Sequence, residues 1–230
     1  QADSCIGSKS SINLGNSKNI LGTFNPPDEI LICPSFLSSL PDHEVLSGVG
    51  EIIKVHIIDG QDSFEKVSNS YDQIVTDELK LLEYIKRALL IKKKYIEIDE
   101  FDKGIRNIFN YGHSFGHAIE SATQFAIPHG IAVTIGMDMA NRIAAWRNIL
   151  PEDFYHKMHP VLKKNYKDYE NVKIPVDKMI DAIKKDKKNI KDNLVLIMPV
   201  GDKANVEKIK VKPDSIFVDQ CETFLNSLNT

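Results

Sequence analysis

The chain has 230 residues, of which 42% are apolar and 27% are charged, and its formal net charge is −3. This length allows one large or two small domains with a sizeable core, and the near balance of charge excludes a general nucleic-acid-binding protein, whose phosphate contacts need a basic surface. The three cysteines lack metal-ligand spacing, and the sequence shows neither a transmembrane run nor a leader, so we expect a soluble, cytoplasmic protein with free thiols and no membrane partner.

The chain opens with a polar, loop-like stretch over residues 1–29, followed by the short apolar run "EILICP" (29–34), whose composition favours a strand. Gln1 is not an initiator methionine. We therefore expect the chain to be a fragment or a processed product.

Helical patterns follow. Pro41-Asp42 with Glu44 is typical of a helix start and predicts a helix over about 42–58. Residues 77–95 are amphipathic, because apolar side chains recur at nearly helical spacing at Leu79, Leu82, Ile85, Leu89 and Ile91.

The second half continues this pattern. A turn over 97–112 leads into a helix over 113–125, a helix that is apolar on most sides (131–150) and an amphipathic helix over 176–189. Residues 193–202 and 206–212 alternate like a β-pair, and a final helix covers 213–228. The sum predicts a mainly α, multi-helical fold with a small β component and no βαβ alternation.

Three of the seven histidines fall within 21 residues, between Asn110 and Gly130. His113 and His117 are four apart and share a helix face, and His129 lies beyond a helix break. A metal site, a proton relay and coincidental packing are all compatible with this spacing. Zinc binds imidazole nitrogen and carboxylate oxygen, so two or three of these histidines with one carboxylate would suffice.

Glycines and charged residues surround the candidates. Gly112 and Gly116 each precede a histidine, and glycine costs roughly 1 kcal/mol in a helix, so something must approach this backbone closely. Glu120 is either an orienting partner or a surface residue. Glu51 and Lys54, three apart, have the spacing of a surface salt bridge. Asn110 and five dispersed cations would suit an anionic substrate if they converge, namely Lys9, Lys18, Lys92, Arg106 and Lys187.

The segment "RNIFNYGHSFGHAIE" (106–120) followed by "PHG" (128–130) resembles the signature "R..LN.GHTFGHAIE…HG" of the dehydroquinate synthase and sugar phosphate cyclase family. Further blocks resemble that family in the same order, over nearly all 230 residues. They are "ADSCIGSKSSINLGNSKNILGTFNPP", "LPDHEVLSGVGEIIK", "IKKKYIEIDEFDKGIR" and "DKKN".

The resemblance implies a role for each matched position. The metal ligands would be Glu51, His113 and His129. His117 and Asn110 would serve substrate phosphate and proton transfer, and Lys54, Lys92 and Arg106 would contact substrate hydroxyls and carboxylate. The residues that bind the phosphate or carboxylate end of the substrate would be Lys9, Lys18, Asn19 and Lys187. Asp3 would lie by the part of the site that faces the cofactor.

The resemblance also implies a reaction. A heptulosonate phosphate would be cyclised with release of phosphate to dehydroquinate, in the shikimate pathway of aromatic amino acid biosynthesis. The enzyme would be a carbon–oxygen lyase and a homodimer. Its cofactors would be a divalent metal, zinc or else cobalt, and NAD in the complete enzyme.

Departures from the family pattern qualify these expectations. No G-x-G-x-x-G occurs, so we expect residues 1–40 to be the remnant of an α/β dinucleotide-binding domain and 41–230 to be the helical metal-binding domain. Such a chain should bind NAD poorly and be inactive alone. Ile131 and Asp102 stand where the family commonly has glutamate, which keeps open a deoxy-inosose or valiolone cyclase. A non-catalytic metal-binding module is the alternative from another class.

Overall fold

The computed structural model describes residues 2–14, 17–185, 189 and 193–228, and for residues 13–20 it gives at most the backbone. Two hairpins accompany a set of helices, with strands β1 (Lys9–Leu14), β2 (Ser17–Phe24), β3 (Leu194–Val200) and β4 (Asn205–Val211). The α-helices are α1 (Asp42–Ile58), α2 (Gln61–Asn69), α3 (Tyr71–Thr76), α4 (Glu78–Ile98), α5 (His113–Ala122), α6 (His129–Trp146), α7 (Glu152–Tyr166), α8 (Val176–Lys184) and α9 (Ser215–Ser227). Short 3₁₀ helices are η1 (Pro34–Ser39), η2 (Ile105–Asn110) and η3 (Lys167–Tyr169).

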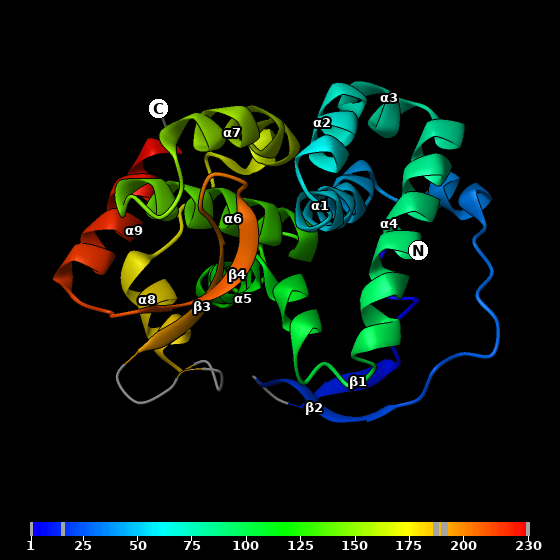
Figure 1. Ribbon diagram of the computed structural model, residues 1–230, viewed down its shortest axis with the longest axis horizontal. Helices are drawn as coiled ribbons and strands as arrows, with labels where there is room; N and C mark the ends of the chain where they lie inside the picture. The colour runs from blue at the N-terminus through cyan, green and yellow to red at the C-terminus, as the bar shows by residue number, and fades with distance from the viewer. Residues whose placement is uncertain (1, 15–16, 186–188, 190–192, 229–230) are drawn as a thin grey trace.

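The fold is mainly α with a small β component, which confirms the predicted class. Each sheet is a two-stranded antiparallel hairpin, β1 with β2 and β3 with β4. Figure 1 shows α5 to α9 and the β3–β4 hairpin on one side, and α1 to α4 with the β1–β2 hairpin on the other.

Helix α6 is the centre of the core. It packs against α1, α5, α7, α9 and β3, and most of its side chains are buried, as expected for a helix that is apolar on most sides. It begins at His129, two residues before the predicted start, directly after Pro128. Because α6 crosses α1 and α5, it holds together the two helices that carry the other candidate ligands.

Glycines make these crossings close. A Cβ on Gly50 of α1 would lie 2.5 Å from the carbonyl oxygen of Gly130, and one on Gly116 of α5 would lie 3.0 Å from the Val133 backbone. The N-cap of α5, Gly112, has φ +75° and also faces α6. What approaches these glycines is therefore helix α6. The close approach expected at Gly112 and Gly116 is thus explained by helix packing.

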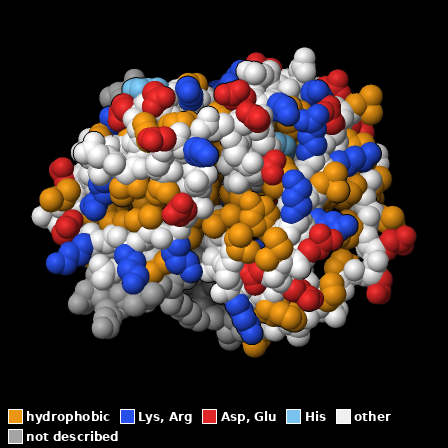
Figure 2. All heavy atoms as spheres, in the orientation of Figure 1, with side chains coloured by type: hydrophobic (Ala, Val, Ile, Leu, Met, Phe, Trp, Pro, Cys, Tyr) orange, Lys and Arg blue, Asp and Glu red, His pale blue; other side chains and the backbone are white. Residues whose placement is uncertain are grey.

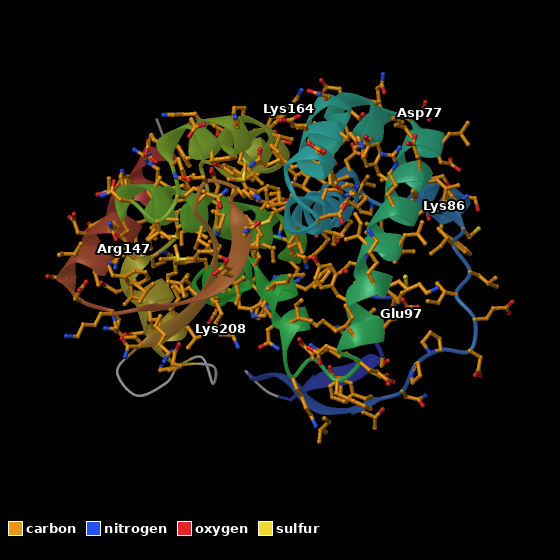
Figure 3. The ribbon with its side chains drawn as sticks, viewed as in Figure 1. Asp77, Lys86, Glu97, Arg147, Lys164 and Lys208 are labelled. Atoms are coloured by element: carbon orange, nitrogen blue, oxygen red, sulfur yellow. The ribbon has the colours of Figure 1, made fainter. Side chains whose placement is uncertain are left out.

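Helices α1 and α4 confirm the patterns that predicted them. The bounds of α1 agree with the expected 42–58. Asp77 caps α4 by accepting hydrogen bonds from Leu79 N and Lys80 N, and Figure 3 places Asp77 and Glu97 toward opposite ends of this helix. The expected apolar stripe is wrong at its first member: Leu79 is 77% exposed, because Leu81 and Tyr84 face the core instead.

The N-terminal part departs most from expectation. The loop-like stretch contains the β1–β2 hairpin, and the expected strand over 29–34 is absent from these described residues. From β2 the chain runs along the edge of the molecule on the α4 side, up to η1 and α1 (Figure 1). None of the described strands pairs with residues 29–34, so their backbone N–H and C=O groups have no sheet hydrogen bonds. An apolar composition alone therefore does not make a strand there.

The C-terminal elements follow the predicted order. The β3–β4 hairpin confirms the predicted β-pair, with Leu194 paired to Val211 and Val200 to Asn205. The expected alternation is absent from β3, which is buried along nearly its whole length. Asp214 caps α9 by accepting a hydrogen bond from Phe217 N. Helix α8 ends at Lys184, and the "DKK" that follows lies outside the described residues. No helix of the described chain is long and apolar enough to span a membrane. On the face in Figure 2, both signs of charge are interspersed.

Candidate functional site: a histidine and carboxylate cluster beside a cationic cavity

A cavity of about 420 Å³ opens where the N-terminal segment meets the helices. Nine of its lining residues were predicted as site residues from the sequence. They are Asp3, Lys9, Lys54, Lys92, Arg106, Asn110, His113, His117 and His129. The chain thus converges at one place from the segment before β1, α1, α4, η2, α5 and α6.

The three histidines form a tight group at this cavity. Their ring centroids are 5.3 Å apart for His113 and His129, 5.4 Å for His113 and His117, and 5.6 Å for His117 and His129. One nitrogen of each ring lies within 4.8 Å of the others. This spacing is compatible with ligands of a single metal ion.

Glu51 completes the group from α1. Its Oε1 lies 3.7 Å from Nε2 of His113 and 3.5 Å from Nε2 of His129. Two ligands of a tetrahedral zinc, each about 2.0–2.1 Å from it, lie roughly 3.3–3.5 Å from one another. Oε1 is buried and has no hydrogen-bond partner among the described residues. A buried carboxylate oxygen without a partner costs free energy, and a cation shared with two imidazoles would remove that cost.

The remaining nitrogen of each of these two rings is already engaged. Nδ1 of His113 lies 3.1 Å from the carbonyl oxygen of Tyr111, and Nδ1 of His129 lies 3.2 Å from Oε1 of Glu120. An acceptor at Nδ1 fixes the proton there and leaves the Nε2 lone pair for a metal. Glu120, left open between an orienting and a surface role, is buried and orients His129.

Electrostatics keeps His113 neutral. Burial, the positive charge of Lys54 and the neighbouring histidines together hold the pKa of His113 well below its usual range. A neutral imidazole is the form that binds a metal, so the arrangement favours the ligand state.

Lys54 and Lys92 meet the carboxylate of Asp3 at the inner end of the cavity. Lys54 forms ion pairs with Glu51 and, at 3.5 Å, with Asp3 Oδ2, while Lys92 Nζ lies 2.6 Å from Asp3 Oδ1. Lys54 is 1% exposed, so its i, i+3 pair with Glu51 is not the surface salt bridge that the spacing alone suggested.

This network shifts the pKa of each member. Burial alone would raise the pKa of Asp3, but the Lys54 and Lys92 ammonium groups hold it far below its usual value. Burial also disfavours charge on the lysines. The two carboxylates nevertheless raise the pKa of Lys54, whereas burial prevails and lowers the pKa of Lys92.

Arg106, Lys9 and Asn110 also line the cavity. Arg106 is buried and donates from Nη2 to the carbonyl oxygen of Gly7 at 2.6 Å, which ties the segment before β1 to η2. Lys9 pairs with Asp102, another lining residue. Asn110 donates to the Asn107 carbonyl oxygen at 3.0 Å.

Three predicted site residues are not placed at the cavity. Lys18 and Asn19 lie in the first half of β2, where the structure gives only the backbone of residues 17–20. Lys187 lies outside the described residues. Their predicted contacts with a phosphate or carboxylate stay predictions.

Other residues at the site had no assigned role from the sequence. Ser4, Ile6 and Phe109 line the cavity, and Ser47 Oγ accepts a hydrogen bond from Gly130 N at 2.8 Å, next to His129. The serine beside Gly48 in "LSGVGE" was a usable signal, because a hydroxyl next to glycines on a helix can reach the start of another helix.

Comparison with known sequences identifies the family of the chain. Residues 48–189, more than half of the chain, match the family described as 3-dehydroquinate synthase C-terminal, and residues 1–47 match 3-dehydroquinate synthase N-terminal. The chain belongs to the 3-dehydroquinate synthase family. The recognition made from the sequence is thereby confirmed.

Curated relatives of the chain are named 3-dehydroquinate synthase. The chain is 34% identical over 218 residues to 3-dehydroquinate synthase of Alkaliphilus metalliredigens, covering 94% of this chain and 61% of the relative. It is 36% identical over 220 residues to the enzyme of Thermoanaerobacter sp. (strain X514), with the same coverage. The chain thus spans about three-fifths of the length of these relatives.

Solved structures share the fold. A 2-deoxy-scyllo-inosose synthase complexed with carbaglucose-6-phosphate, NAD⁺ and Co²⁺ superposes with a TM-score of 0.78 at 24% identity, covering 98% of this chain and 64% of that one. The 2-epi-5-epi-valiolone synthase of Streptomyces hygroscopicus, with NAD⁺ and Zn²⁺ bound, gives 0.80 at 23% identity, covering 99% and 62%.

Proposed function

We propose that the chain is the metal- and substrate-binding part of a 3-dehydroquinate synthase, which cyclises a heptulosonate phosphate with release of inorganic phosphate. The observation that carries this proposal is the buried Oε1 of Glu51, without a hydrogen-bond partner among the described residues and facing Nε2 of His113 and of His129. The curated relatives at 31–41% identity support the substrate class.

We infer that Glu51, His113 and His129 hold one divalent ion, zinc first and cobalt as the alternative. The donor set of two imidazoles and a carboxylate is one that zinc binds, and the related cyclases contain Zn²⁺ or Co²⁺. When bound, such an ion supplies Lewis-acid polarisation of a substrate oxygen. His117 is assigned to the substrate side together with Asn110, where it can hold or accept a proton.

The cations of the cavity would bind the anionic ends of the substrate. Lys54 is held as ammonium by Asp3 and Glu51, and Arg106 retains further N–H donors beyond the two that contact main-chain carbonyls. These groups would bind the phosphate and the carboxylate and orient the chain of carbons between them. Fixed orientation of reacting groups accounts for much of the rate enhancement in an intramolecular ring closure.

The described residues do not fit a dinucleotide. The sequence lacks G-x-G-x-x-G, and Asp3, expected to face the cofactor, is paired with Lys54 and Lys92. We therefore assign no hydride step to these residues. NAD use by the whole protein, the division at residue 40, a homodimer and a cytoplasmic location stay predictions.

A second candidate is another sugar phosphate cyclase. A second crystal structure of 2-deoxy-scyllo-inosose synthase shares 26% identity with this chain over 96% of its length, and Asp102 lines the cavity where the family commonly has glutamate. Substrates of this second class bear no carboxylate.

Calorimetric titration of the zinc-loaded chain with candidate substrates distinguishes the two proposed functions. The first proposal predicts that a heptulosonate phosphate binds more tightly than glucose 6-phosphate or sedoheptulose 7-phosphate, and that Arg106→Met reduces this preference. Exposed Arg87→Met is the control. Equal binding of the three phosphates would contradict the assignment to the carboxylate-bearing substrate, and zinc that does not load at all would contradict the metal site.

A further inference from the structure

A second polar cavity, of about 280 Å³, lies between α6, α7 and α9 and shares no lining residue with the first. Neither the histidine cluster nor the resemblance to the family assigns it a role. Its walls combine aromatic rings with side chains that carry or can carry positive charge.

A buried carboxylate–imidazole pair lies behind the cavity wall, and of the two residues only His159 lines the cavity. Asp138 of α6 is fully buried, and its Oδ2 accepts hydrogen bonds from Tyr166 at 2.6 Å and from Nδ1 of His159 at 2.8 Å. The structure shows no hydrogen-bond partner for Asp138 Oδ1 or for His159 Nε2 in the part of the chain that it describes. Because His159 lines the cavity and its Nδ1 is occupied, Nε2 is the ring atom left for a ligand.

The charged and titratable lining is cationic in character. Arg142, Lys163, His156 and His159 line the cavity, and no aspartate or glutamate does. Glu152 and Glu170 pair with Arg142 and Lys163 from outside the lining. An anion entering here would meet no carboxylate on the wall.

The guanidinium of Arg142 is held between two rings. Its Cζ lies 4.6 Å from the ring centroid of Trp146 and 4.7 Å from that of Tyr155. This stacking fixes the plane of the guanidinium and reduces the entropy lost when it binds a ligand. Among the described residues, only Nη1 is used in an ion pair, with Glu152, so further N–H donors stay available for a carboxylate.

We propose that this cavity is a binding site for a small aromatic carboxylate, whose carboxylate is bound by Arg142 and His159 and whose ring lies against Trp146. The volume suits a single-ring ligand, which is smaller than the sugar acid phosphate proposed for the first cavity. The site is independent of the proposed metal, because it shares no residue with that cluster.

Benzoate is the probe, titrated against the 230-residue chain by calorimetry and by tryptophan fluorescence. Trp146 is the only tryptophan of the chain and lines this cavity, so its emission reports on this site. We expect saturable binding with a change in Trp146 emission. Acetate, which lacks the ring, and benzamide, which lacks the charge, should each bind at least about tenfold more weakly, a difference near 1.4 kcal/mol.

Arg142→Met keeps apolar volume between the rings while removing the charge, and it should weaken benzoate binding by about tenfold or more. His159→Asn, which keeps a donor near Asp138 and removes Nε2, serves as a second variant if the first is poorly folded by circular dichroism. Lys157→Met is the matched control, because Lys157 lies on α7 outside the cavity and pairs with Asp153. Equal binding of benzamide, equal binding of acetate, or undiminished benzoate binding by the folded variants would each overturn the proposal.

Discussion

The helical body (residues 42–228) and the N-terminal segment (residues 2–40) are held by different forces. The body buries a continuous apolar core around α6. Of the side chains described between residues 2 and 40, no apolar one is buried, and Leu31 and Phe36 are 82% and 71% exposed.

The segment is tied to the body by polar contacts at the first cavity, through Asp3 to Lys54 and Lys92 and through Gly7 to Arg106. Among its described side chains, the apolar contribution is limited to Ala2, Ile32 and Leu37, which are half-buried against the core. All three proposed metal ligands belong to the body. We therefore predict that metal binding and closure of the substrate cavity can be separated in this chain.

The largest effect is expected where α1 crosses α6. A Cβ on Gly50 would lie 2.4 Å from Thr134 Oγ1 and 2.5 Å from the Gly130 carbonyl oxygen, so Gly50→Ala should destabilise the body by about 1–3 kcal/mol and displace Glu51. Gly48→Ala is the control on the same helix, since its Cβ meets only Ala2 at 3.8 Å. It should stabilise α1 by about 0.5–1 kcal/mol. Thermal unfolding measures both, and equal melting temperatures would refute the crossing.

Glu120→Gln should change the metal affinity and leave the N-terminal segment in place. Glu120 orients His129 through Nδ1, and removal of such a partner typically lowers metal affinity by about 10–100-fold. Competition of the chain with a zinc chelator of known affinity measures this change. The control is Glu97→Gln at the exposed end of α4 (Figure 3), which should have no effect.

Asp3→Asn should loosen the N-terminal segment and leave the metal affinity nearly unchanged. Loss of the charge weakens the ties to Lys54 and Lys92 by about 1–3 kcal/mol, so residues before β2 should be cleaved faster by proteases while the body melts at nearly its original temperature. Zinc affinity should change less than in Glu120→Gln. Asp28→Asn, an exposed position of the same segment, is the control. Cooperative melting of segment and body together would show that they are not separable.

The reactivity of the cysteines measures the difference in burial between segment and body without any substitution. Cys5 and Cys33 are half-buried in the segment, whereas Cys221 is buried in α9, where burial raises its pKa to about 12. At pH 8 the thiolate population of Cys221 is therefore very small. A thiol reagent should modify two cysteines of the native chain and the third only after unfolding. Rapid modification of all three would place α9 outside the core.

The sequence predicted the body better than the segment, for physical reasons. Helix α4 carries a periodic apolar face, whereas α1 and β3 carry continuous apolar runs that are buried on most sides, and both patterns can be recognised in a sequence. The β1–β2 hairpin is rich in serine and asparagine and buries no described apolar side chain, so no alternation marks it.

The site was predictable in its members and not in its contacts. The resemblance selected nine residues that line one cavity. Spacing could not show that Gly112 and Gly116 face α6, that Glu51 and Lys54 are buried, or that Glu120 reaches His129. These features depend on how three helices cross, which a single sequence does not specify.

Cobalt titration followed by visible absorption is the direct test of which side chains bind the metal ion. We predict one Co²⁺ per chain with a tetrahedral spectrum, lost in Glu51→Ala, His113→Ala and His129→Ala and retained in His117→Ala and in the exposed control His43→Ala. Loss of the spectrum in His117→Ala together with its retention in Glu51→Ala would contradict the account, because the ion would then be held by the three histidines alone.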